Sequence, residues 1–136
     1  MSFHRYDRDS EVHIIDCSGQ LSLETGMTRL QVLKRELAEH PPVDGVAKLL
    51  IDFRNTVWED ENVHMQLSRI TRAEFGLKPG NSSIRAAFVH TGGSGGVSDN
   101  ERWFASEAAA MDWLCSRAAE DPASAAETRS PVTRAP

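Results

Sequence analysis

The alternation of apolar and polar positions along the chain predicts strands that alternate with helices. Residues 3–7 and the run around Val12 alternate apolar and polar side chains, which favours a hairpin or an edge pair with one face in water. The continuous apolar run at residues 49–51 is typical of a strand covered on both faces in a parallel sheet, and residues 84–90 are expected to form another apolar strand. A further short strand is expected at residues 102–104.

Three stretches carry apolar residues at helical spacing. The first helix is expected to begin near Ser22, a favoured N-cap residue, and to end at the His-Pro-Pro run of residues 40–42. The second is expected over residues 61–75, with acids at its start, where the helix dipole favours negative charge, and a stop at Gly76. The third follows its N-cap, Ser106. The inward face expected for the first helix comprises Met27, Leu30, Leu33 and Leu37.

These elements predict an α/β fold in the order β-β-α-β-α-β-β-α. Strands that alternate with helices at such spacings favour a single, mostly parallel, five-stranded sheet with an antiparallel edge strand and three main helices. A length of 136 residues suits one domain, expected over residues 1–120. Residues 121–136 are rich in Ala, Ser, Thr and Pro, which predicts a flexible C-terminal tail.

Composition excludes several classes of protein. A formal net charge of -5 without a Lys/Arg cluster argues against nucleic-acid binding, because phosphate contacts need a basic face. No run approaches the roughly 20 apolar residues of a membrane helix, so no membrane insertion is expected. The chain start lacks the apolar stretch of a signal peptide, and Cys17 and Cys115 are far apart. We therefore expect a cytoplasmic protein with free thiols, as a monomer or weak homodimer.

One edge of the predicted sheet collects polar and aromatic residues. Ligands in open α/β sheets favour the carboxyl ends of the strands. The strand at 49–51 is followed there by a polar bend with one tryptophan, and the strand at 84–90 by a glycine-rich loop at 91–98. The alternative is ordinary capping of the sheet. The predicted partner- or ligand-binding residues are Arg54, Asn55, Thr56, Trp58, Asp60, Glu61, His90 and Gly93.

Other chemistries have less support from the sequence. Ser94 lies in a G-x-S-x-G run, but a hydrolase elbow needs a helix directly behind it and a histidine after it, and every histidine precedes Ser94. Glu61 and His64 could share a helix face, yet no His-x-x-x-His or Cys-x-x-Cys pair supplies further ligands, so no metal and no cofactor are expected. Trp103 and Trp113 are expected in the core, and Cys17 is expected to be buried.

Three motifs resemble those of a known family. They are Asp-Cys-Ser-Gly-Gln-Leu-Ser at residues 16–22, Lys-Leu-Leu-Ile-Asp-Phe-Arg at 48–54, and the Trp-Phe strand with an alanine-rich helix ending in Trp-Leu at 102–114. Over residues 3–114 the chain resembles the STAS domain, and more closely its SpoIIAA-like branch, which is related to the lipid-binding Sec14 shape. The phosphorylatable serine of anti-sigma antagonists falls on Glu61, so the resemblance implies a module without that phosphorylation switch.

Three functions remain open from the sequence. The first is a non-enzymatic binding or regulatory module of the STAS, SpoIIAA-like type that recognises a protein partner through Trp58 and its neighbours. The second is a carrier or sensor of a small apolar, lipid-like ligand, held in a pocket between sheet and helices lined by Phe75, Leu77 and Phe88. The third and most distant is a small hydrolase that uses Ser94.

Overall fold

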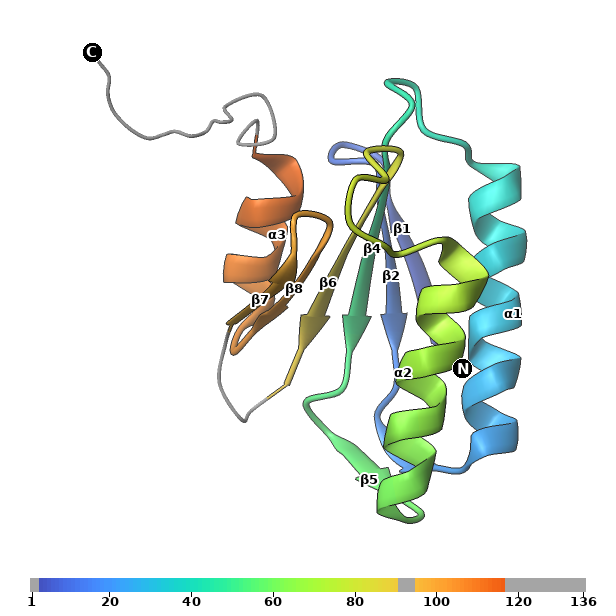
Figure 1. Ribbon diagram of the computed structural model, residues 1–136. Helices are drawn as coiled ribbons and strands as arrows, with labels where there is room; N and C mark the ends of the chain where they lie inside the picture. The colour runs from blue at the N-terminus through green and yellow to red at the C-terminus, as the bar shows by residue number, and fades with distance from the viewer. Residues whose placement is uncertain (1–2, 91–94, 117–136) are drawn as a thin grey trace.

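Three helices cover the two faces of a central sheet in the computed structural model, which describes residues 3–90 and 95–116, with backbone only at 95–98 (Figure 1). The helices are α1 (Leu23–Glu39), α2 (Glu61–Phe75) and α3 (Glu107–Cys115). The strands of the central sheet are β1 (His4–Asp7), β2 (Val12–Asp16), β4 (Ala47–Asp52), β6 (Ile84–Val89), β7 (Gly95–Ser98) and β8 (Glu101–Phe104).

The central sheet has the strand order β1-β2-β4-β6-β8-β7. Strands β2, β4, β6 and β8 run parallel, whereas β1 and β7 are antiparallel to their neighbours at the two edges. Ile15, Ile51 and Phe88 stand side by side in register across the three middle strands. The predicted α/β class, the mostly parallel sheet with an antiparallel edge strand, and the three helices are confirmed, and all five predicted strands belong to the sheet.

The structure adds three short strands to the five that the sequence predicts. Strand β7 takes part of the segment predicted as a glycine-rich loop, and residues 91–94 lie outside the described part of the chain. Strands β3 (Gly19–Leu21) and β5 (Thr56–Trp58) form a separate parallel pair beyond the ends of β2 and β4. Three-residue strands and glycine-rich strands carry little periodicity or β-propensity, so long-range pairing decides them.

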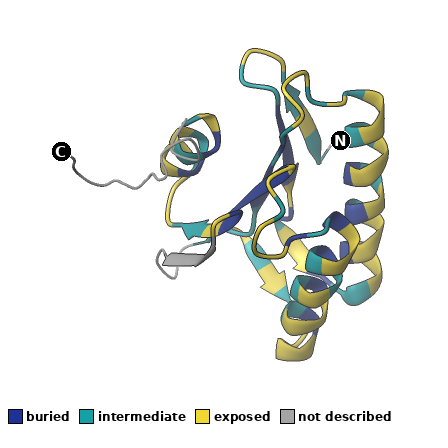
Figure 2. Ribbon diagram, turned by 45° about the horizontal axis from the view of Figure 1, so that its top comes forward, coloured by how far each residue is buried: buried dark blue, intermediate teal, exposed yellow. Residues whose placement is uncertain are grey.

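Two hydrophobic clusters lie on opposite faces of the sheet. Helices α1 and α2 cover the face that carries Ile15, Leu49 and Ile51, and α3 covers the face that carries Ile14 and Leu50. In Figure 2 the sheet is mostly buried, and each helix has one buried side and one exposed side. Among the described residues, no helix combines the length and apolarity needed to cross a bilayer.

Local capping signals set the ends of the helices. Ser22 and Ser106 are the N-caps of α1 and α3 as predicted, and Asp60, which the sequence analysis assigns to the binding site, is the N-cap of α2; each side chain accepts a backbone N–H from the residue three positions later. Gly76 ends α2 in the left-handed conformation that favours glycine, with φ of 65°. His40 ends α1, directly before the two prolines.

Two predictions about exposure are wrong. Met27 is 40% exposed, because Gly26 takes the inward position beside it and brings α1 close to Leu67 of α2. The hairpin of β1 and β2 is confirmed, but β2 has no face in water, since the side chain of His13 is 1% exposed beneath the end of α1. The tail predicted over residues 121–136 lies outside the described residues.

Candidate functional site

The candidate site lies at the carboxyl ends of β4 and β6, where a turn at residues 53–55 leads into β5. This turn is tied to the segment that follows β2. The Thr56 hydroxyl donates to the carbonyl oxygen of Cys17 at 2.6 Å, and the Gly19 N–H donates to the carbonyl oxygen of Asn55 at 2.9 Å. The separate pair of β3 and β5 thus lies beyond the carboxyl edge of the central sheet (Figure 1).

A cleft of about 170 Å³ opens at this edge. Its lining comes from the turn, β5, the start of α2, the residue after β6, and β8, so five segments converge on it. The lining residues are Phe53, Arg54, Thr56, Trp58, His64, His90 and Trp103.

Aromatic rings in contact with one another form the walls of the cleft. The ring of Phe53 lies with its centroid 5.1 Å from that of Trp58 and is stacked on Trp103 at 6.2 Å. His64 lies 4.7 Å from Trp58, and His90 meets Trp103 edge-on at 5.0 Å. Because each ring is held by at least one other, the walls are preorganised rather than free to collapse.

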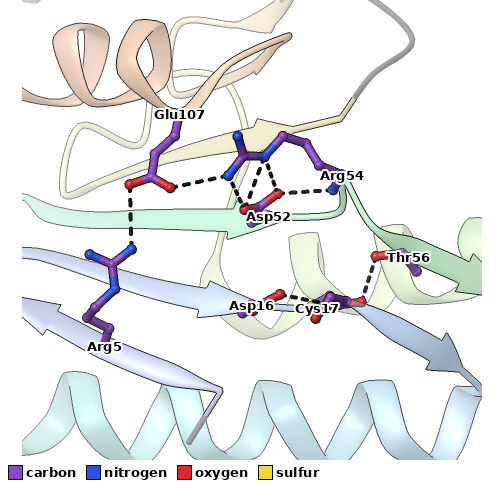
Figure 3. Close-up of polar contacts among 8 residues, drawn as sticks. Arg5, Asp16, Cys17, Asp52, Arg54, Thr56 and Glu107 are labelled. Carbon is purple, nitrogen blue, oxygen red and sulfur yellow. Dashed lines mark hydrogen bonds and ion pairs between the residues drawn. The ribbon is translucent and has the colours of Figure 1, made fainter.

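Arg54 is held at the rim by two carboxylates (Figure 3). Its guanidinium donates three hydrogen bonds to Asp52, the shortest at 2.7 Å, and a fourth to Glu107 of α3 at 3.3 Å. Arg5 of β1 reaches the same Glu107 at 3.5 Å. Burial acts to raise the pKa of Asp52, but the hydrogen bonds from Arg54 outweigh it and lower that pKa below its usual value. Asp52 therefore stays ionised and holds Arg54 in place.

The imidazole of His64 is kept neutral in the cleft. Burial lowers its pKa, and the positive charge of Arg72 lowers it further. A neutral imidazole both donates and accepts hydrogen bonds. No carboxylate is among the described residues that line the cleft, so the polar groups that face it are a guanidinium, a hydroxyl and imidazoles.

Four of the eight predicted site residues line this cleft: Arg54, Thr56, Trp58 and His90. The other described ones do not. Asn55 is exposed on the turn, Asp60 caps α2 by accepting the Val63 N–H at 3.2 Å, and Glu61 is exposed in the first helical turn. Gly93, like Ser94 of the hydrolase hypothesis, lies outside the described residues.

Sequence reasoning missed three lining residues. Phe53 directly precedes Arg54 but is not among the predicted site residues. His64 is weighed in the sequence only as a metal ligand, not as a wall of a cleft. Trp103 packs against the core as expected, but it is half-buried and also forms a wall of the cleft. Trp103 of β8 pairs in register with Phe88 of β6, which lies two residues before the predicted site residue His90. This pairing of β8 with β6 is what brings Trp103 to the cleft.

Elsewhere, the residues proposed to line a carrier pocket are packed in the core. Phe75, Leu77 and Phe88 are all buried in the cluster between the sheet and the first two helices. Cys17 is buried as predicted, and burial raises the pKa of its thiol to about 12. Trp113 is half-buried against the other cluster, with the guanidinium of Arg85 4.3 Å from its ring centroid.

Comparisons of this chain with protein-family models, curated proteins and solved structures find no match. The STAS resemblance therefore remains a prediction from the sequence motifs. The structure itself defines a three-layer α/β protein with an aromatic-walled cleft at the carboxyl edge of its sheet.

Proposed function

We propose that this chain is a non-enzymatic, cytoplasmic binding module of the STAS, SpoIIAA-like type, and that its cleft receives one planar side chain of a protein partner. The observation that carries the proposal is the convergence of Trp58, Trp103 and Phe53 around a small cleft with a fixed arginine at its rim. Tryptophan and arginine are the residues that contribute most to binding energy at protein interfaces.

The size of the cleft favours a single side chain over a lipid. Its volume is about 170 Å³. Pockets for drug-sized ligands span about 300–1,000 Å³.

The test begins with affinity capture from the protein's own host, followed by isothermal titration calorimetry with the purified partner. Trp58→Ala is expected to weaken binding about 30-fold, the effect of losing a 2 kcal/mol hot spot. His64→Gln removes a second wall with less disturbance of packing and is expected to weaken binding as well. Met27→Ala, at an exposed position on α1, is the matched control and is expected to leave affinity unchanged.

Two outcomes would contradict the proposal. A captured partner whose affinity is the same for wild type, Trp58→Ala and His64→Gln, with all three folded by circular dichroism, would bind elsewhere. Native mass spectrometry is the second measurement. A reproducible bound mass of a few hundred daltons that is lost on denaturation would replace the partner-binding module with the ligand carrier.

A further inference from the structure

The hydrogen-bonding groups that line the cleft restrict which planar side chain it can receive. A side chain that enters the cleft displaces water from these groups, and each N–H that is then left without an acceptor weakens binding. The donors and acceptors that are still available in the lining therefore describe the chemistry of the occupant.

One end of the Arg54 guanidinium is available to an occupant. Its Nε and Nη2 both bond to Asp52, and Nη2 also bonds to Glu107. Its Nη1 has no hydrogen-bond partner among the described residues, and in Figure 3 it is the guanidinium nitrogen without a dashed line. Because the guanidinium is planar and rigid, the two bonded nitrogens also fix the direction of Nη1. Arg54 lines the cleft, so Nη1 is the nitrogen with which it can bond an occupant.

Two indole N–H groups add to the donors of the lining. Within the described part of the chain, neither Trp58 nor Trp103 donates a hydrogen bond from its Nε1. Neither of these nitrogens is a buried polar atom without a partner, so both are open to solvent. An indole N–H can only donate, so each of them requires an acceptor when an occupant excludes water.

Two acceptors accompany these donors. The Thr56 hydroxyl donates to the carbonyl oxygen of Cys17, and its own oxygen keeps lone pairs that can accept. The imidazole of His64 has no hydrogen bond among the described residues, so one ring nitrogen can donate and the other can accept. An occupant that offers both an acceptor oxygen and donor N–H groups would satisfy both kinds of group.

The charges around Arg54 disfavour an occupant that carries a charge of either sign. A cation is repelled by the guanidinium itself. An anion meets Asp52 and Glu107, which bond to Arg54, and also the charge of Asp16. Arg5 pairs with Glu107 and offsets only one of these three carboxylates. An uncharged occupant avoids both repulsions.

We propose that the partner side chain received by the cleft is the carboxamide of Asn or Gln, an assignment that rests on the proposed function. The carboxamide is planar and uncharged. Its oxygen has two lone pairs for the N–H groups of Arg54 and the indoles, and its NH₂ has two donors for Thr56 and His64. An apolar side chain of the same size would leave those N–H groups without acceptors.

The test titrates the full chain at pH 7.5 with four small probes that share one ring and differ in the attached group. Benzamide carries the carboxamide, whereas phenol, benzoate and benzylammonium carry a hydroxyl, an anion and a cation. The indole N–H signals in nitrogen–proton correlation NMR spectra report binding. Trp58 and Trp103 line the cleft, and Trp113, which packs on the cluster at the other face of the sheet, is the internal reference.

Benzamide is expected to shift the indole signals of Trp58 and Trp103 but not that of Trp113, with a Kd on the order of 10 mM for a molecule of this size. The other three probes are expected to bind at least about 10-fold more weakly, because each lacks the donors, lacks the acceptor or carries a charge.

Two variants change the hydrogen-bonding groups of the cleft. Arg54→Lys keeps a positive charge beside Asp52 but removes the planar fork that directs Nη1, and His64→Phe keeps a ring but removes the imidazole nitrogens. They are expected to weaken benzamide binding about 10-fold and about 5-fold. Arg35→Lys makes the first of these changes at an exposed position of α1, and it is expected to bind benzamide as wild type does.

Three results would overturn the assignment. Binding of phenol, benzoate or benzylammonium as tight as that of benzamide would show that the cleft does not select a carboxamide. Equal benzamide affinity in wild type and both variants, each with the dispersed spectrum of a folded protein, would place the probe elsewhere. Unshifted Trp58 and Trp103 signals at about 50 mM benzamide would also overturn it. None of these results involves the partner, so the titration of the captured partner against Trp58→Ala still decides the proposed function separately.

Discussion

The contact of α1 with α2 at Gly26 yields a prediction about stability that the structure defines atom by atom. A Cβ at position 26 would lie 2.8 Å from Leu67 Cδ2 and closer still to Cδ1. Leu67 is buried in the core between the sheet and both helices, so it cannot swing into solvent. Gly26→Ala must therefore displace a packed side chain.

Two opposing effects set the size of the change. Alanine in place of glycine inside a helix gains about 1 kcal/mol, whereas an extra methyl group in a packed core costs about 1–3 kcal/mol. Because two atoms of Leu67 overlap the new methyl, we take the upper part of that range. The free energy of unfolding is then expected to fall by about 1–2 kcal/mol in Gly26→Ala.

A double-mutant cycle isolates the contact. Leu67→Ala alone is expected to cost about 2–5 kcal/mol, through lost burial and the cavity it leaves. In Gly26→Ala/Leu67→Ala the methyl group introduced at position 26 enters that space, so the double variant should lose at least about 1 kcal/mol less than the two single losses combined. Urea unfolding followed by tryptophan fluorescence measures all three variants.

The control is Thr28→Ala, at an exposed position of the same helix, which is expected to change stability by less than about 0.5 kcal/mol. Two results would refute the reasoning. If Gly26→Ala stabilises the protein by about 1 kcal/mol, helix propensity alone acts and the overlap has no cost. If the two substitutions are additive within about 0.5 kcal/mol, Leu67 does not limit position 26.

Three further predictions concern other parts of the molecule. Arg72→Leu should lower the free energy of unfolding by about 3 kcal/mol, because it leaves the carboxylate of Glu101, which is 2% exposed, without its bidentate partner. The double variant Arg72→Leu/Glu101→Leu should recover most of that loss. A double variant that is less stable in urea than Arg72→Leu would contradict this prediction. With Cys17 buried and its thiol pKa raised to about 12, iodoacetamide at pH 8 should label the native protein once, at exposed Cys115, and the unfolded protein twice; two labels on the native protein by mass spectrometry would disprove it. Folding lowers the pKa of His64, so the stabilising contribution of its neutral imidazole is complete above about pH 6.5 and is lost as the pH falls from there toward the lowered pKa. His64→Gln should therefore lose less stability than wild type between pH 7.5 and 5.5. Equal losses in the two proteins would count against a buried neutral imidazole.

The features that the sequence predicts well are those set by neighbouring residues. Ser22 and Ser106 cap the first and third helices because each can accept an N–H three residues along, which needs no distant partner. Gly76 ends α2 because it tolerates positive φ. The buried strands are recognisable because, in an α/β protein, a strand of a parallel sheet that is covered by helices on both faces is apolar on both of its sides.

The features that the sequence does not predict depend on distant segments. Whether Met27 or Gly26 faces inward depends on where Leu67 of α2 approaches, and a helical period alone leaves both open. Trp103 belongs to the cleft because β8 pairs with β6, a fact of topology.

The two short strands β3 and β5 place a constraint on chain length. Residues of β2 pair with β4 residues 36 positions later, as Asp16 does with Asp52, whereas β3 pairs with β5 at 37, as Gly19 does with Thr56. The segment at 53–55 is thus one residue longer than its counterpart at 17–18, and the surplus residue makes the turn from which Phe53 and Arg54 line the cleft. Deletion of one residue there would equalise the two segments and remove that turn, even if every lining side chain were retained. In related chains that keep the cleft, we expect substitutions in this segment to be tolerated more often than insertions or deletions.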